Sequence, residues 1–390
     1  MEMVGKKVKV LIIGGMGVIG GAITKASASK GLDVYVVSRR SLFDEWKELD
    51  IIEIQGDWKN DEFANRVVAD FYDVIIDTQI FNEKQLIRSL DIVNNHCKQF
   101  IYISTDSVYS HPAYDLDESV DIKLSELKWK YGYDKRKAEL FLLREGSKYN
   151  FYWTVIRPTI TFGNTRIPVG FSTKRNTYTL AERMIAGKPI VVFDDEKSYH
   201  AVCHVTIFGN AVVELFLQEK AANQFYHISD DKSYTYAEIF NAIEQVLGIK
   251  GKYVHAKTDW LKKYSKSSYE EMIFDKNPTF TLNNNKIKSI ATHTSFHVDM
   301  VDVMASTLYH LKKAGGIDSD FNRINDCILL KLSRQNDNSY EQDIITDYIK
   351  GLPDEYINSL KKYERRLSIS NIINFCKKLM RPIKHVLLPK

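Results

Sequence analysis

The sequence has little cysteine, and the cysteines that it has are scattered. None of the four belongs to a C-x-x-C pair: Cys97, Cys203, Cys327 and Cys376. Such spacing favours neither a zinc site nor a disulfide framework. His200 and His204 have the i, i+4 spacing of a helical ligand pair, but the residues around them are typical of a strand or a loop. We therefore expect no metal.

Long apolar runs are also absent. No stretch reaches the ~18 apolar residues that a membrane span needs, and the N-terminus lacks the apolar region of a secretory signal. These absences predict a cytoplasmic protein with reduced cysteines. The net charge of +4 is too small to imply nucleic-acid binding by itself. With 390 residues, 44% hydrophobic and 27% charged, the chain has an ordinary globular composition, and its length suits one large unit with a cap or two domains.

The most informative motif is a glycine turn close to the N-terminus. An apolar, β-branched run over residues 8–13 leads into three glycines with G-x-x-G-x-x-G spacing, and a helical stretch follows. Strand, glycine turn and helix is the order that a dinucleotide site requires, because glycine lets the backbone approach a pyrophosphate and the helix N-terminus offers free N–H groups. A plain tight turn is the alternative. The residues expected to contact the cofactor here are Gly14, Met16, Gly17, Val18, Ile19 and Gly20.

Strand-like and helix-like segments alternate through the first half of the chain. After the opening run, the expected strands are residues 33–37, 51–54, 73–77, 100–103 and 152–156. Helical stretches, such as residues 83–96 and 135–143, separate most of them. This alternation predicts an α/β fold of the Rossmann type, with a doubly wound parallel sheet.

We expect three parts in this chain. Residues 1–165 form the dinucleotide-binding domain, to which the chain returns near residues 200–230. Residues 166–315 form mainly a smaller, interleaved α/β cap that binds the substrate, and residues 316–390 form a helical C-terminal extension. The elements expected after residue 165 are helices at 179–186, 205–217 and 236–247 and strands at 190–193 and 224–228.

The end of the chain is basic and amphipathic. Residues 361–390 contain nine Lys or Arg and a single acid, Glu364, and apolar residues from Ile369 to Ile383 recur at i, i+3, i+4 and i+7. This pattern predicts a helix that ends or bends near Pro382. Two interpretations remain open. The helix packs on its own domain or on a second subunit of the homodimer that we expect, or it attaches to the anionic inner face of a membrane.

The end of the second expected strand indicates which dinucleotide binds. NAD sites place an acid there for the ribose hydroxyls, whereas NADP sites place an arginine for the 2′-phosphate. This strand runs into Ser38, Arg39 and Arg40 with no acid, so we expect NADP in preference to NAD; solvated arginines are the alternative. After the third strand, Asp57, followed by Trp58, is placed to accept from the adenine amino group, with a helix N-cap as the alternative.

A hydroxyl cluster and a tyrosine–lysine pair form the second constellation. Residues 104–109, Ser-Thr-Asp-Ser-Val-Tyr, follow the fifth strand, and a Tyr-Gly-Tyr-Asp-Lys-Arg-Lys stretch follows at 131–137. A tyrosine and a lysine four residues apart share one helix face, and a nearby ammonium favours the phenolate, so the tyrosine can act as an acid or a base. Two registers fit, Tyr131 with Lys135 and Tyr133 with Lys137.

The order and spacing of these motifs resemble the extended short-chain dehydrogenase/reductase superfamily, in its NAD(P)-dependent nucleotide-sugar epimerase/dehydratase branch. The resemblance covers residues 6–310, and its Y-G-x-x-K-x-x-A-E pattern selects the first register. It implies that Tyr131 is the general acid/base, that Lys135 binds the nicotinamide ribose and lowers the tyrosine pKa, and that Thr105 orients the substrate oxygen. It also implies that Thr78 lines the cofactor and that Pro158 lies beside the nicotinamide.

The chain departs from that family at two places. His200 stands where an arginine often grips a nucleoside diphosphate, and Thr105 is followed by Asp106-Ser107 instead of the Asp-Glu pair of dehydratases, which makes dehydration less favoured. The resemblance thus implies an oxidoreductase or epimerase that exchanges hydride with a sugar, which we expect to be nucleotide-linked, in nucleotide-sugar or surface-polysaccharide metabolism. The alternative is a dinucleotide-binding scaffold or an RNA-binding protein related to chloroplast stem-loop-binding proteins, but nucleic acid is not the expected partner.

Overall fold

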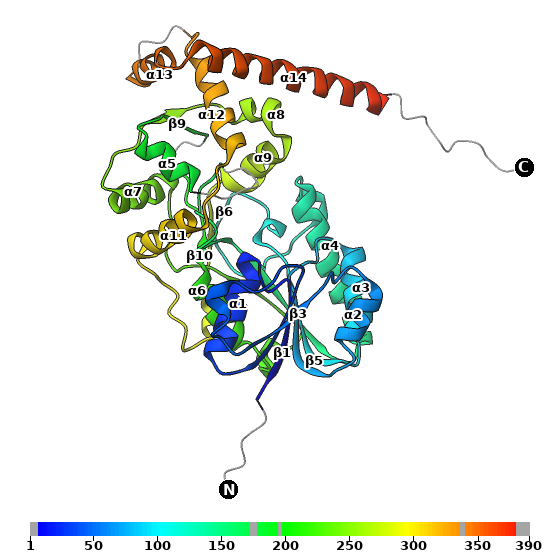
Figure 1. Ribbon diagram of the computed structural model, residues 1–390. Helices are drawn as coiled ribbons and strands as arrows, with labels where there is room; N and C mark the ends of the chain where they lie inside the picture. Colours follow the sequence, from blue (N-terminus) through cyan, green and yellow to red (C-terminus); the bar gives the residue numbers. More distant parts are fainter. Residues whose placement is uncertain (1–6, 172–177, 194–196, 336–339, 380–390) are drawn as a thin grey trace, which may run out of the picture.

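A seven-stranded parallel sheet is the centre of the structure. We describe a computed structural model over residues 7–171, 178–193, 197–335 and 340–379 (Figure 1). The sheet order is β11-β7-β5-β4-β1-β2-β3. Its strands are β1 Lys9–Ile13, β2 Asp33–Ser38, β3 Ile51–Gln55, β4 Tyr72–Asp77, β5 Cys97–Ile103, β7 Tyr152–Pro158 and β11 Gln224–Ile228. The predicted Rossmann-type fold is confirmed, including the return of residues 224–228 to the main sheet.

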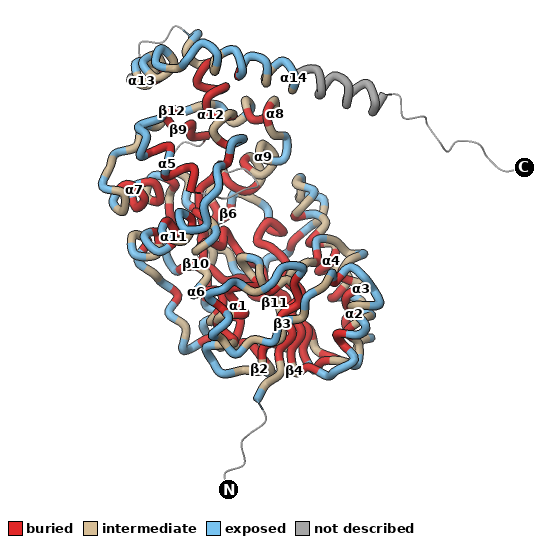
Figure 2. Tube along the Cα trace, in the orientation of Figure 1, coloured by how far each residue is buried: buried red, intermediate tan, exposed pale blue. Residues whose placement is uncertain are grey.

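The central strands are apolar throughout because both faces of the sheet are covered. In β1, Val10 and Ile12 face one hydrophobic cluster, whereas Leu11 and Ile13 face the other. Helices α1 Val18–Ser29 and α6 Val205–Glu214 pack on the first face. Helices α2 Asp61–Val67, α3 Glu83–Val93 and α4 Lys130–Glu145 pack on the second. Figure 2 shows the strands as a buried layer between these helices.

The cap has a hydrophobic core of its own, assembled from separate pieces of chain. Its helices are α5 Thr179–Ile185, α7 Tyr236–Leu247, α8 Leu261–Tyr264, α9 Lys266–Glu271 and α11 Met300–Ala314, whereas the short helix α10 Asn285–Lys288 packs through Ile287 on the first face of the main sheet. A π-helical turn, η7 Met272–Lys276, directly continues α9. Three short parallel strand pairs join the pieces: β8 Ile160–Phe162 with β10 Val202–His204, β9 Ile190–Val192 with β12 Tyr253–His255, and β6 Ala113–Leu116 with β13 Phe280–Leu282. Of these six strands only β9 was predicted, because each strand is short and most partners are far apart in sequence.

The C-terminal helices are α12 Ser319–Leu332, α13 Tyr340–Lys350 and α14 Asp354–Leu379. Although α12 lies in the segment that we set apart as an extension, its Phe321 and Ile328 belong to the same core as α5 and α7. The carboxylate of Asp326 ties these helices together, since it pairs with Arg183 of α5 at 2.6 Å and accepts hydrogen bonds from Tyr348 of α13 and Tyr356 of α14. Thus residues up to the first turns of α14 are part of the folded cap.

Helix α14 then continues beyond the cap (Figure 1). The expected amphipathic stripe begins at Ile369, and the side chains of residues 368–379 lie outside the described part of the chain, as does the expected end or bend near Pro382. No helix within the described residues is long and apolar enough to cross a membrane.

Candidate active site

The glycine turn holds the end of β1 against the start of α1. Gly14 has a φ of +78°, and a Cβ at this position would lie 2.3 Å from Thr78 Oγ1. A Cβ at Gly20 would lie 2.3 Å from the Gly14 carbonyl oxygen, so α1 can approach the turn only because both residues lack side chains. Gly17 is the N-cap of α1 and supplies no side-chain cap, which leaves the first amides of the helix available to a ligand. This arrangement fits the pyrophosphate of a dinucleotide.

Other residues expected to contact the cofactor lie at the ends of strands β2 and β4. At the end of β2, Arg39 and Arg40 are exposed, and Ser38 Oγ accepts a hydrogen bond from the Arg40 amide at 3.1 Å. No acid stands at this strand end. Thr78 Oγ1 donates to the Ile13 carbonyl oxygen at 2.9 Å, so its side chain ties the end of β4 to β1. The positions of both features agree with a dinucleotide lying across the carboxyl edge of the sheet.

The segment after β3 contains Asp57 and Trp58, the two residues that we expected near the adenine. Asp57 is exposed and its Oδ1 accepts from the Lys59 amide, while Asn60 caps α2 by accepting from the Phe63 amide at 2.8 Å. The N-cap interpretation of Asp57 is therefore wrong. The indole of Trp58 is 3% exposed and packs in the core beneath the sheet. The side chain of Trp58 is therefore part of the core and is not exposed to a cofactor.

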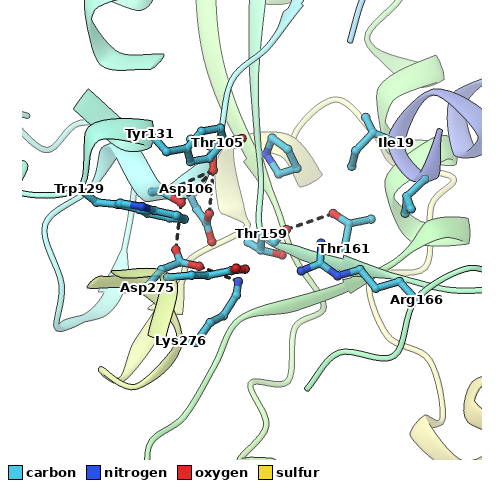
Figure 3. Close-up of a pocket in the computed structure, with 14 residues that line it drawn as sticks. Ile19, Thr105, Asp106, Trp129, Tyr131, Thr159, Thr161, Arg166, Asp275 and Lys276 are labelled. Atoms are coloured by element: carbon cyan, nitrogen blue, oxygen red, sulfur yellow. Dashed lines mark hydrogen bonds and ion pairs between the residues drawn. The ribbon is translucent and has the colours of Figure 1, made fainter. Parts of the chain in front are cut away.

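A cavity of about 320 Å³ lies between the nucleotide domain and the cap (Figure 3). Val18 and Ile19 reach it from α1, and Thr105 and Tyr131 reach it from the other side of the sheet edge. The remaining lining comes from the turn after β5, the N-cap of α4, the end of β7 and the segment that follows it, the end of α9 and the π-helical turn: Asp106, Ser107, Trp129, Pro158, Thr159, Thr161, Arg166, Glu271, Asp275 and Lys276. The cavity thus joins the start of the predicted cofactor helix to the predicted hydroxyl groups.

A close contact between α4 and the Thr105 turn sets the tyrosine register. A Cβ at Gly132 would lie 2.0 Å from the Ser107 carbonyl oxygen, so only glycine lets the helix start this near. Tyr131 then lines the cavity, whereas Tyr133 is 37% exposed and Lys137 pairs with Glu83 at the surface. Of the two registers, the structure brings Tyr131, not Tyr133, to Thr105.

The electrostatics of this pair differ from the expectation. Burial raises the pKa of Tyr131 to about 12, although the hydrogen bond between Tyr131 and Thr105 acts in the opposite direction. Lys135 Nζ donates to the carbonyl oxygens of Ile80 and Ile103 and lies 5.9 Å from the centre of the Tyr131 ring. Burial lowers the pKa of Lys135 to about 7. In the protein alone, desolvation of the phenol therefore outweighs the expected effect of the lysine.

A buried ion-pair network under α4 was missed as a unit by the sequence analysis. Glu139 accepts from Ser104 Oγ at 2.7 Å and from Arg157 Nε and Nη2 at 2.9 and 2.8 Å. Arg136 donates to the same carboxylate at 2.9 Å, and Arg157 Nη1 donates to the Tyr109 hydroxyl at 2.9 Å. The network joins α4 to β5 and β7, so it holds the helix that carries Tyr131 and Lys135 against the sheet edge.

Two further findings concern the cap. His200 is buried and its ring stacks on Tyr236, with centroids 4.1 Å apart, so it does not line the cavity in the way that a phosphate-binding arginine would. Asp275 and Lys276 do line it, but no motif marked them, because they reach the site on the π-helical turn. Within the described residues, no three His, Cys, Asp or Glu side chains are arranged to hold a metal ion.

Comparison with solved structures gives the same fold. Pal from Bacillus thuringiensis matches with 19% identity and a TM-score of 0.61, covering 79% of this chain and 100% of that one. UDP-glucuronic acid 4-epimerase from Bacillus cereus, in complex with UDP-glucuronic acid and NAD, matches with 15% identity, a TM-score of 0.62 and the same coverage. UDP-N-acetylglucosamine 4-epimerase from Methanobrevibacter ruminantium M1, in complex with UDP-N-acetylmuramic acid, matches with 16% identity and a TM-score of 0.62, covering 80% of this chain and 100% of that one. At these identities the likeness establishes the fold.

No curated protein matches this chain. The family assignment comes instead from the sequence pattern itself, since the NAD dependent epimerase/dehydratase family matches residues 10–228, more than half of the 390 residues. The matched range contains the glycine turn, Thr105, Tyr131 and the return strand β11. The chain therefore belongs to the NAD dependent epimerase/dehydratase family and is an enzyme of the extended short-chain dehydrogenase/reductase type.

Proposed function

We propose that this enzyme exchanges hydride with a carbon of a nucleotide-linked sugar, as an epimerase or a related oxidoreductase of nucleotide-sugar or surface-polysaccharide metabolism. One observation carries the proposal: the start of the cofactor helix and the hydroxyls of Thr105 and Tyr131 line a single cavity. A bound nicotinamide supplies hydride exchange, and a sugar carbon in this cavity would have both the cofactor and the tyrosine beside it.

The roles of the individual side chains follow from their places. Tyr131 moves the proton of the substrate hydroxyl, and Thr105 holds the substrate oxygen beside the phenol. Lys135, buried under the site, binds the nicotinamide ribose, and Pro158 lies against the nicotinamide. Buried Thr159 Oγ1 and Arg166 Nε have no hydrogen-bond partner within the described residues, and both residues line the cavity. Unsatisfied buried polar atoms favour a ligand rich in oxygen, such as a sugar.

The carrier of the sugar rests on weaker support than the sugar itself. Two of the similar structures are complexes with a UDP-sugar, UDP-glucuronic acid in one and UDP-N-acetylmuramic acid in the other. In this chain the stacked His200 cannot grip a diphosphate, so we assign that part of the ligand to cationic groups that line the cavity, Arg166 and Lys276.

A panel of UDP- and dTDP-sugars tests the proposed reaction. Small molecules released from the purified protein are first identified by mass spectrometry, and each panel sugar is then added to the protein with NAD and with NADP. We expect at least one sugar to change the absorbance of the cofactor or to be converted to an isomer. Cofactor binding without any conversion across the panel would contradict the proposal and favour a dinucleotide-binding scaffold.

We also propose that NADP is preferred, on the support of Arg39 and Arg40 at the end of β2. Fluorescence titration should show tighter binding of NADPH than of NADH. Replacing both arginines by serine should weaken NADPH binding by about 100-fold or more, since each lost phosphate contact is worth ~1.5–3 kcal/mol, and leave NADH binding nearly unchanged. The exposed Arg66 of α2 serves as the matched control for charge. Equal affinity of the wild-type protein for the two cofactors would discard this assignment.

The basic C-terminal stretch is the part of the chain that we expected to contact a membrane or a second subunit. We propose that the basic stretch from residue 368 onward attaches to an anionic membrane surface, because its sequence combines an apolar repeat with Lys and Arg. Removing residues 368–390 should abolish sedimentation with phosphatidylglycerol vesicles and leave cofactor binding intact, because Glu364 already anchors α14 by accepting from Tyr264 and Lys263. Vesicle binding that survives truncation would contradict it. If the segment instead holds the expected homodimer together, truncation changes the oligomeric state measured by light scattering.

A further inference from the structure

Two buried carboxyl groups are linked to Tyr131 by a chain of hydroxyls. Thr105, which hydrogen bonds the Tyr131 phenol, donates from Oγ1 to Asp106 Oδ1 at 3.2 Å. Ser107 Oγ lies 3.1 Å from Thr105 Oγ1 and donates to Asp275 Oδ1 at 2.9 Å. These four linking residues are each at most 8% exposed, and Figure 3 shows Thr105, Asp106 and Asp275 grouped on the same side of the cavity as Tyr131. The nucleotide domain supplies Asp106, and the cap supplies Asp275.

The charges around the two carboxyl groups separate their roles. Lys276 Nζ lies 2.6 Å from Asp275 Oδ2. Burial raises the pKa of Asp275, but Lys276 and His111 outweigh burial and hold it below its ordinary value, so Asp275 stays charged. Lys276 also lowers the pKa of Asp106, but burial and the Asp275 charge outweigh this effect and raise the pKa of Asp106 to about 7. The other ionisable groups of the cavity are Tyr131, Arg166 and Glu271.

The tyrosine needs an outlet for its proton. A phenol with a pKa of about 12 is almost entirely protonated at neutral pH, so a mechanism that begins with free phenolate would start from a very rare state. Oxidation of a sugar carbinol releases a proton at the place where Tyr131 stands. A carboxylate that is linked to Tyr131 through one hydroxyl can accept a proton in the same step, so that no phenolate has to form.

We propose that Thr105 and Asp106 form a proton relay for Tyr131, and that Asp275 with Lys276, from the cap, sets the charge of its terminal acceptor. This inference rests on the proposed function. As the hydride leaves the sugar carbon for the nicotinamide, the sugar hydroxyl proton passes to the phenol oxygen. The phenol's own proton passes to Thr105 Oγ1, and the Thr105 proton passes to Asp106 Oδ1. The sugar becomes a carbonyl compound, Tyr131 remains a phenol and Asp106 becomes a carboxylic acid; reduction runs the same path backward.

The relay spans both domains, which gives the cap a chemical role. Asp275 is carried by the π-helical turn that continues α9, and its carboxylate accepts a hydrogen bond from Ser107 of the nucleotide domain. If the cap were displaced, Asp106 would no longer lie beside the negative charge of Asp275, which helps to raise its pKa to about 7. The pKa of Asp106, the proton acceptor, is therefore raised by Asp275 only when the cap lies over the substrate.

Carbon-13 NMR tests the acceptor without any substrate. The full-length protein, labelled at the aspartate carboxyl carbons, is titrated between about pH 5 and about pH 9. We expect the signal of one carboxyl carbon to titrate with a midpoint near pH 7. This signal should be missing in Asp106→Asn. In Asp275→Asn its midpoint should move to lower pH, because the charge that raises the pKa of Asp106 is gone. Asp259→Asn, on the exposed surface of the cap, is the matched control and should change neither. Absence of a carboxyl group titrating near pH 7 would overturn the proposal.

The pH dependence of turnover tests the relay itself, with the sugar that reacts in the panel. Wild-type turnover should fall as the pH drops through about 7, since Asp106 must be ionised to accept. Asp106→Asn should lower kcat at pH 7 by about 100-fold or more, with KM little changed, and its rate should rise about tenfold per pH unit as Tyr131 itself ionises. Asp275→Asn should keep its rate at lower pH than the wild type. Thr105→Ser should retain the wild-type profile, whereas Thr105→Val should behave like Asp106→Asn.

The outcomes separate the relay from the proposed function. If Tyr131→Phe keeps full turnover, the tyrosine is not the acid/base and the proposed function fails with it. If Tyr131→Phe is inactive but Asp106→Asn keeps the wild-type kcat and pH profile, the relay alone is overturned.

Discussion

Replacing Tyr131 with phenylalanine is expected to lower turnover by about 10²–10⁴-fold, the usual contribution of a positioned acid/base group, while cofactor affinity is retained. The phenol oxygen stands at the cavity beside Thr105, and its ring remains in the variant, so α4 keeps its packing. Turnover is measured with the reacting panel sugar, and cofactor affinity is measured by fluorescence titration.

Tyr133→Phe is the matched control for this substitution. It changes the same atoms two residues away on the same helix, at a position 37% exposed outside the cavity. Its turnover should equal that of the wild type. Loss of turnover in Tyr133→Phe, with Tyr131→Phe active, would show that the other register performs the chemistry and would remove the support for Thr105 as its partner.

The nucleotide-binding half could be predicted from sequence because its signals are local. A buried parallel strand such as β1 must be apolar on both faces, and Gly14 and Gly20 stand where a Cβ would strike the backbone or a neighbouring strand end. The tyrosine register was harder, since both pairs fit the spacing. Gly132 decides it in physical terms, because a Cβ there would lie 2.0 Å from the Ser107 carbonyl oxygen.

The cap side of the site could not be predicted in the same way. Asp275 and Lys276 have no motif around them and reach the cavity on the π-helical turn, and Asp275 is 168 residues away in sequence from its partner Ser107. The extension likewise gave no sign that its first helix completes the cap core through Phe321 and Asp326, because an apolar helix face does not reveal its partner. Contacts between distant segments decide both features.

Breaking the ion pair between Glu139 and Arg157 is expected to lower the stability of the protein strongly. Both side chains are at most 2% exposed, so Glu139→Gln leaves two guanidinium groups buried without their counter-charge. Breaking a buried pair in this way costs about 3–5 kcal/mol of unfolding free energy, which urea denaturation can measure. Because α4 would lose its tie to β5 and β7, turnover should fall as well. Glu145→Gln, whose partners Arg144 and Lys148 lie at the surface of the same region, should change stability little.

The pH dependence of this loss has a definite sign. Burial alone would raise the pKa of Glu139, but Arg157 and Arg136 outweigh burial and hold it below its ordinary value. A lowered folded-state pKa contributes stability that is present above the unfolded value of about 4.3 and disappears as the pH falls through the folded value. The difference between wild type and Glu139→Gln should therefore be constant near neutrality and shrink below about pH 4. A difference that grows on acidification would contradict an ionised Glu139, whereas recovery of stability in the double variant Glu139→Met/Arg157→Met would show that the cost lies in the unpaired charge.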